Sequence, residues 1–189
     1  MYFGLRKSLH AVVCNRLYCS HDLKVQISVD GVPLYKSSPM QFWPILCSVN
    51  NSSPILVALF LGTTKPNSAE AFLDDFCKEF DQLSKDGFVC VECARNVNLP
   101  VTLHAVVCNA PARAFLKNIK GHNSLRACER CEAVAVSMNN RTIFSSESCF
   151  KADKRCSDVF SDGGYYGTHQ NGPTPLTTMS NDCINTSVH

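Results

Sequence analysis

The sequence predicts an α/β fold, and the order of its apolar patterns over 189 residues carries that prediction. Three strand-like runs precede the first helical pattern, and a further buried run and a short helical pattern follow it. Residues 137–189 are instead rich in Ser, Asn, Thr, Gly and Asp. Strands and helices in this order are typical of a sheet covered by helices, and we expect the last segment to be mostly loop.

The three expected strands lie early in the chain. The run KVQISVDG alternates apolar and polar residues from Val25 to Val29 and ends at Asp30, which is followed by glycine. Such alternation is typical of a half-buried strand. Two continuous apolar runs bounded by turn residues predict two more strands. These runs are residues 42–49 and 54–62. The first twenty-odd residues show no clear periodicity.

A helix is expected next, with Asn67 as its N-cap and Glu70 in capping-box spacing. Its apolar stripe is Phe72, Leu73, Phe76, Phe80 and Leu83, and Gly87 ends it. Residues 88–93 and 101–108 predict further strands. A short helix then follows Asn109, with a proline in its first turn and Gly121 beyond its last turn.

Asp30 and Asn109 each have two interpretations. Three strands before a helix, with an acid on the first strand, suit an RNase H-like fold, although many α/β folds share that outline. Asp30 is then either a turn residue or a carboxylate that binds a divalent cation for phosphoryl transfer. Asn109 is either the N-cap of the short helix or a residue in a metal site. An asparagine offers a metal one neutral oxygen, whereas an aspartate offers a full charge.

Cysteines supply a candidate metal site. Cys128 and Cys131 have the spacing of half a zinc knuckle, and His122 upstream and His169 downstream could complete it. Cysteine is frequent, with 12 residues, and no signal-peptide pattern precedes these cysteines. We therefore expect a reducing compartment, nuclear or cytoplasmic, and no secretion. The apolar run 54–62 is too short to span a bilayer, so no membrane contact is expected.

The charges point only weakly to a partner. The net charge of +2 does not by itself indicate nucleic acid. Arg113, Lys117 and Lys120 recur at helical spacing. The favoured interpretation is a solvated helix face, and the alternative is that they contact DNA phosphates. The heptamer LHAVVCN occurs at residues 9–15 and 103–109, but the repeat extends no further and is not architectural.

Four blocks together resemble a known family. VDGVPLYKSSPMQFWPIL, CNAPARAFLKNIKGH, ACERC and HQNGPTPL occur in this order between residues 24 and 182. They resemble the transposase-derived proteins of the CACTA-type cut-and-paste DNA transposons. The resemblance implies an RNase H-like core that binds Mg²⁺ or Mn²⁺, a zinc-binding Cys/His insertion, and DNA as the substrate. Members of that family are normally several times longer, so the resemblance also implies a fragment, a decayed copy or a truncated gene model.

The resemblance assigns roles to single residues. Asp30 matches the first catalytic acid, whereas Asn109 stands where the family has the second. Cys128 and Cys131 match the zinc pair. His169 matches the first of two adjacent histidines, the second of which is replaced by a glutamine. We therefore expect a flank (1–23), a partial core (24–126), a zinc insertion (127–175) and a tail (176–189).

Three hypotheses follow from the resemblance and the residues. The first is a catalytically inactive transposase fragment, because the second acid is lost and the third is not identifiable. The second is a zinc-stabilised module that binds DNA or a protein without cutting. The third is an active nuclease that recruits Asp158, Asp162 or Asp182. The first hypothesis predicts that the strand carrying Asp30 lies beside the strand that ends at Asn109.

Overall fold

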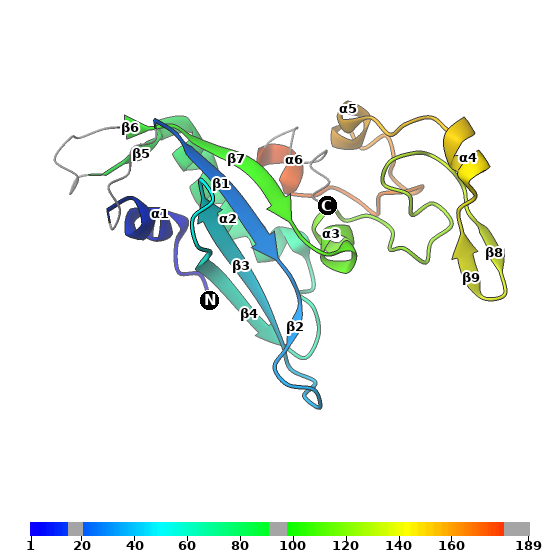
Figure 1. Cartoon of the computed structure of the whole chain (residues 1–189), viewed down its shortest axis with the longest axis horizontal. Coiled ribbons are helices and arrows are strands. Elements are labelled where there is room, and N and C mark those ends of the chain that lie inside the picture. Colours follow the sequence, from blue (N-terminus) through cyan, green and yellow to red (C-terminus); the bar gives the residue numbers. More distant parts are fainter. Residues whose placement is uncertain (15–20, 91–97, 180–189) are drawn as a thin grey trace.

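The computed structural model describes residues 1–14, 21–90 and 98–179. Its main feature is a mixed sheet packed against helices, so the predicted α/β class is confirmed. Figure 1 shows this sheet with α2 behind it, and a lobe of short elements after α3. Within the described residues, no helix has the length and apolar character needed to cross a bilayer.

The sheet is built around β1 (Leu23–Val29). It pairs antiparallel with β3 (Gln41–Val49) on one side and parallel with β7 (Val101–Val107) on the other. Beyond β3, β4 (Ile55–Gly62) pairs antiparallel, and the short β2 (Val32–Pro33) also pairs with β3. The long strands therefore lie in the order β4-β3-β1-β7, and the predicted strands 42–49 and 54–62 are confirmed. Because β1, β4 and β7 run in the same direction, their carboxyl ends share one edge.

The long helix α2 (Ala69–Asp86) joins β4 to the second part of the chain. Its buried side includes Leu73, Phe76, Phe80 and Leu83, as the apolar stripe predicts. Asn67 was expected as the N-cap, but Ser68 fills that position and accepts the Ala71 N–H at 3.3 Å. At the other end, Gly87 has a φ of 76°, which favours glycine and ends the helix as predicted.

The N-terminal segment is a helix, α1 (Leu5–Cys14), and not an unpatterned flank. Leu5, Leu9, Val12 and Val13 are buried in the main core at helical spacing, so the periodicity is present but short. The Glu79 carboxylate on α2 accepts the backbone N–H of Leu5 at 2.5 Å and also the hydroxyl of Tyr2. A carboxylate at this position satisfies free N–H groups at the start of α1 and fixes the helix to α2.

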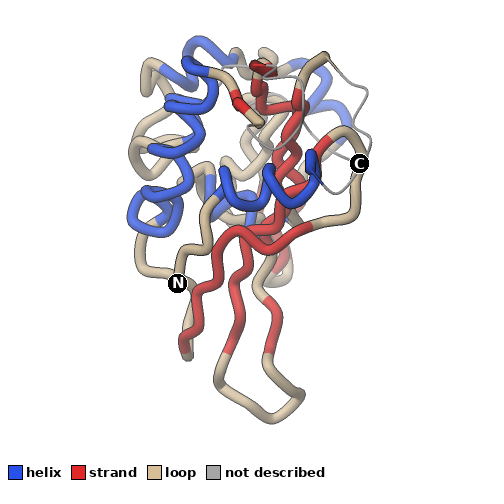
Figure 2. Tube along the Cα trace, turned by 90° about the vertical axis from the view of Figure 1, so that its left-hand side faces the viewer, coloured by secondary structure: helices blue, strands red, loops and turns tan. Residues whose placement is uncertain are grey.

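Short elements make up the remainder of the described chain. They are β5 (Phe88–Val89), β6 (Asn98–Leu99), α3 (Ala110–Leu116), β8 (Val136–Met138), β9 (Arg141–Ile143), α4 (Ser146–Lys151), α5 (Ser157–Ser161) and α6 (Leu176–Met179). The strand expected at 88–93 is described only as far as residue 90. The α3 helix ends before the expected Gly121, because Asn118 adopts a φ of 51° and turns the chain. Figure 2 shows the same arrangement turned by 90°.

The lobe after α3 has a small apolar cluster of its own, formed by Ile119, Phe160 and Tyr165. The segment then returns to the main core, where Leu176 is buried on α6. The boundary expected at residue 176 therefore falls within a segment that packs on the core. Residues 119–170, which contain this cluster, form the Cys/His lobe.

Candidate functional site

Asp30 and Asn109 meet at the shared carboxyl edge of β1 and β7. The two strands are parallel neighbours, and their last paired residues are Ser28 and Val107. The side-chain Nδ2 of Asn109 donates a hydrogen bond to Oδ1 of Asp30 at 2.6 Å. The predicted adjacency of the two strands is therefore confirmed, and the two residues are in direct contact.

Asn109 serves the helix and the acid at the same time. Its Oδ1 accepts the backbone N–H of Ala112 at 2.9 Å, which makes it the N-cap of α3, as predicted. Because the helix needs an acceptor, the oxygen must face Ala112 and the NH₂ group is left for Asp30. An aspartate at 109 would cap the helix equally well, but it would have no hydrogen to give to Asp30.

Aromatic residues hold the Asp30 turn against α3. A Cβ at Gly31 would lie 2.7 Å from the Trp43 ring, so only glycine fits between the turn and this tryptophan. Trp43 in turn meets Phe115 of α3 edge to face, with ring centroids 5.5 Å apart. The end of β1 is thus fixed to α3 by packing at Phe115 as well as by the Asp30–Asn109 bond at the start of the helix.

Two of the three predicted basic residues, Arg113 on α3 and Lys117 at its C-cap, bind a single acid. Arg113 Nε donates to Glu129 Oε1 at 2.7 Å, and Lys117 Nζ donates to Oε2 at 3.1 Å. Only 13% of the Lys117 side chain is exposed, so the favoured interpretation of a solvated helix face is wrong. Burial would raise the pKa of Glu129, but Lys117 and Arg113 more than offset it and hold that pKa below its ordinary value. Lys120 donates to the carbonyl of Gly167 at 2.9 Å.

These contacts give the three cations a structural role that the sequence analysis missed. Arg113 and Lys117 join α3 to the segment that carries the cysteine pair, because Glu129 lies between Cys128 and Cys131, and Lys120 binds the Gly167 carbonyl farther along that lobe. The signal available in the sequence was the i, i+4 spacing of Arg113 and Lys117, which places two cations side by side and favours a common acidic partner. DNA contact by these residues stays a prediction.

The cysteine pair is brought together as its spacing predicts. The Sγ atoms of Cys128 and Cys131 are 3.3 Å apart. An isolated bridge pairs Cys131 with Lys154, and Arg155 Nε donates to the Cys128 carbonyl at 2.9 Å. Burial is the largest cause that raises the pKa of Cys131 to about 11, and hydrogen bonds to Cys128 and Cys149 add to it. Cys149, on α4, is therefore a third thiol close to the pair.

The two predicted histidine ligands lie in different surroundings. His169 is only 1% exposed, and its Nδ1 bonds to the carbonyl of Arg126 at 2.7 Å. Burial lowers the pKa of His169, so the neutral ring is favoured. His122 is exposed and lines a separate groove. Within residues 1–14, 21–90 and 98–179, no three His, Cys, Asp or Glu side chains form a group that could hold a metal ion.

The donor chemistry nevertheless suits zinc at the cysteine pair. Two thiolates on a tetrahedral zinc ion lie roughly 3.8 Å apart for Zn–S bonds of about 2.3 Å, close to the observed spacing. A histidine that bonds a backbone carbonyl through Nδ1 presents Nε2 to a metal. The neighbouring Gln170 is buried, its Nε2 donates to Phe160 O at 3.0 Å, and its Oε1 has no partner. His122 lies on a separate groove, and the described residues form no metal-holding group of three. The full predicted ligand set is therefore not assembled.

The alternative third acids give no support to a complete catalytic site. Asp158 and Asp162 are exposed at α5 and, in the described chain, belong to no metal-holding group with Asp30. Asp182 lies outside the described residues.

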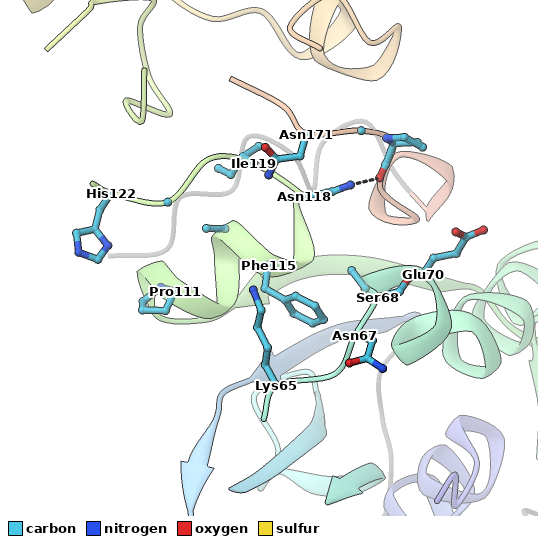
Figure 3. Close-up of a pocket in the computed structure, with 15 residues that line it drawn as sticks. Lys65, Asn67, Ser68, Glu70, Pro111, Phe115, Asn118, Ile119, His122 and Asn171 are labelled. Carbon is cyan, nitrogen blue, oxygen red and sulfur yellow. Dashed lines mark hydrogen bonds between the residues drawn. The ribbon is translucent and has the colours of Figure 1, made fainter. Parts of the chain in front are cut away.

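A groove of about 610 Å³ lies beside this edge of the sheet. One wall is the segment from Lys65 to Glu70, between β4 and α2, and the other comes from α3 and residues 118–122 and 171–173. Figure 3 shows Phe115 between the two walls and the Lys65 side chain reaching it. No candidate site residue except His122 lines this groove.

Comparisons with protein-family models, with curated proteins and with solved structures found no match to this chain.

Proposed function

We propose that this chain is an RNase H-like, transposase-derived module that binds DNA and does not cut it. The contact between Asp30 and Asn109 is the observation that supports this proposal most strongly. An antiparallel β1-β3-β4 meander, a crossing helix and a strand parallel to β1 are also the arrangement expected of an RNase H-like core. The resemblance of the sequence blocks supplies the link to DNA transposition.

The chemistry of the edge explains why cutting is not expected. Phosphoryl transfer with two metal ions needs clustered carboxylates that hold both cations beside the attacking and leaving oxygens. Here Asp30 supplies one carboxylate, and Asn109 gives it a hydrogen bond in the position where a cation would otherwise offset its charge. The site is therefore satisfied without Mg²⁺ or Mn²⁺.

Zinc belongs to the same proposal as a structural cofactor. Cys128 and Cys131 would hold it, with His169 or Cys149 moving in to complete the ligand set. The lobe around them has a small apolar cluster, and such segments gain much of their stability from a metal. A purely zinc-stabilised module that binds a protein is the second candidate, favoured by exposed apolar side chains of the lobe. These are Val136, Met138 and Phe150.

The test uses the full chain with supercoiled plasmid DNA and a labelled duplex. We expect salt-dependent duplex binding, because phosphate contacts release counterions, and no nicking with Mg²⁺ or Mn²⁺. Asp30→Ala is the control for any nicking that does occur. Nicking by the unmodified chain that disappears in Asp30→Ala would show an active nuclease. Absence of duplex binding at low salt would instead refute the DNA module and favour the protein-binding candidate.

A further inference from the structure

The groove between α2 and α3 has a mixed polar and aromatic lining. Phe115 lies between its walls, and the Lys65 ammonium lies 5.3 Å from the centroid of that ring. Amides stand on opposite walls, with Asn67 on one and Asn171 on the other (Figure 3). Within the described residues, Lys65 forms no ion pair, and neither of these amides has a side-chain hydrogen bond. The two amides are thus free to meet a ligand, whereas the Lys65 ammonium would first have to leave the Phe115 ring.

The position of the groove links it to the edge of the sheet that carries Asp30. Lys65 follows the carboxyl end of β4, which shares that edge with β1 and β7. Pro111, in the first turn of α3, lines the groove two residues after Asn109. A strand of nucleic acid at the Asp30–Asn109 pair would therefore pass close to the mouth of the groove.

The lining matches two chemical parts of a nucleotide, the phosphate and the base. A phosphate needs a cation, and Lys65 is the lysine in the groove; a base needs a π surface and amide edges, which Phe115 and the asparagines offer. The volume lies within the usual range of ligand pockets, roughly 300–1,000 Å³. A base paired within a duplex cannot reach an aromatic ring between two walls, so the ligand must be unpaired.

We propose that this groove binds an unpaired nucleotide of a DNA strand, with its phosphate at Lys65 and its base at Phe115. The proposal rests on the proposed DNA-binding function and names the form of DNA that this part of the protein takes. The Lys65 ammonium leaves the Phe115 ring to meet the phosphate, and the vacated ring face receives the base. Trp43 and Phe72 pack against the Phe115 ring and help to keep its orientation.

The experiment measures the anisotropy of a fluorescein-labelled oligothymidylate bound to the full chain at several salt concentrations. Lys65→Gln removes one phosphate contact, so the slope of log K against log salt should fall by about 0.7. Lys85→Gln is the matched control, since Lys85 lies at the far end of α2 and pairs with Asp81. Phe115→Leu should weaken binding by about fivefold or more through lost stacking.

Two further measurements keep the result independent of folding. Melting of each variant identifies any loss of structure, and photocrosslinking of an oligonucleotide with 5-iododeoxyuridine to the unmodified chain should map to Phe115 or His122. Equal slopes for the Lys65 and Lys85 variants, or crosslinks only outside the groove, would overturn the proposal. Duplex binding without oligothymidylate binding would overturn it while leaving the proposed function standing. If the chain binds neither the duplex nor the oligothymidylate, both the groove proposal and the proposed DNA-binding function are refuted.

Discussion

Replacing Asn109 with aspartate changes one group at the edge of the sheet and should destabilise the chain. The substitution keeps the α3 cap, because aspartate and asparagine are equivalent N-caps. It removes the donor that bonds Asp30 at 2.6 Å and puts a second carboxylate in its place. The change therefore isolates the Asp30–Asn109 pair from the cap.

The size of the effect follows from the lost hydrogen bond and from the new repulsion between two carboxylates. A hydrogen bond to a charged group contributes about 1.5–3 kcal/mol, and the lower end applies because this pair is open to solvent. Two carboxylates about 4 Å apart repel by roughly 1 kcal/mol in water and by about 4 kcal/mol near a protein surface. We expect Asn109→Asp to reduce the free energy of unfolding by about 2–3 kcal/mol at neutral pH without divalent cations.

Metal and acid should both reverse this loss. A cation that binds only the folded variant at ten times its Kd returns about 1.4 kcal/mol. Repulsion raises the pKa of one carboxyl of the folded variant above its unfolded value, so the folded state binds more protons as the pH falls. The deficit of the variant against the unmodified chain should therefore shrink on acidification towards that raised pKa.

Urea denaturation with EDTA or with Mg²⁺ measures these effects. The double variant Asp30→Asn with Asn109→Asp is the control, because residue 30 could then donate to an aspartate that still caps α3. It should recover most of the lost stability and respond little to Mg²⁺. If Asn109→Asp alone is as stable as the unmodified chain in EDTA, and Mg²⁺ has no effect, the inferred pair does not contribute to stability.

Three further predictions concern other parts of the chain. Purified protein should contain zinc, and Cys128→Ser with Cys131→Ser should remove it; metal analysis that finds zinc retained in that variant would refute the site. Glu79→Ala should lower the free energy of unfolding by about 2 kcal/mol, because charged hydrogen bonds to the start of α1 are lost, as urea denaturation would show. In metal-free protein at mildly alkaline pH, iodoacetamide should modify Cys128 before Cys47. Hydrogen bonds from the Arg130 backbone and from Cys131 outweigh burial and lower the Cys128 pKa, whereas burial raises the pKa of Cys47 to about 12. Peptide mass mapping measures that order, and faster labelling of Cys47 would contradict it.

Elements with a long or regular apolar pattern could be predicted from the sequence. The alternation of β1 and the stripe of α2 each place several side chains on one face, so the pattern is stronger than local variation. The contact of Asp30 with Asn109 was also predictable as a neighbourhood, since strand ends of parallel neighbours meet. The direction of the hydrogen bond between them could not be predicted, because it depends on how the N-cap interaction orients the Asn109 amide.

The features that sequence reasoning missed depend on tertiary contacts. Glu129 stands inside the cysteine pair, and only the fold places it against Arg113 and Lys117. Cys149 reaches Cys131 because the segment after α4 pairs at Lys154. The groove likewise arises where residues 65–70, α3 and residues 171–173 converge, far apart in sequence. Spacing along the chain indicates at most that Arg113 and Lys117 share a partner, and it does not identify Glu129, Cys149 or the walls of the groove.

The repeated heptamer shows how far local sequence leaves structure open. The first copy of LHAVVC is helical within α1, whereas the second copy supplies residues 103–107 of β7 and runs one residue past its end. In the helix, Leu9 and Val12 are buried, three positions apart as a helical face requires. In the strand, Leu103 and Val106 are buried at the same spacing, which plain alternation forbids. A register shift resolves this, because Leu103 pairs with Val25 while Ala105 pairs with the next residue of β1. His104 is the residue of β7 that has no partner in β1. Because of this extra residue, Leu103 and Val106 can point to the same face of the sheet although they are three positions apart. The partner strand therefore determines the structure of this segment.

A proline at residue 26, which removes a backbone donor of β1 beside the bulge, should release β7 and leave α1 helical. Hydrogen exchange measures this, and loss of protection in both copies of the heptamer would contradict the separate behaviour of the two copies.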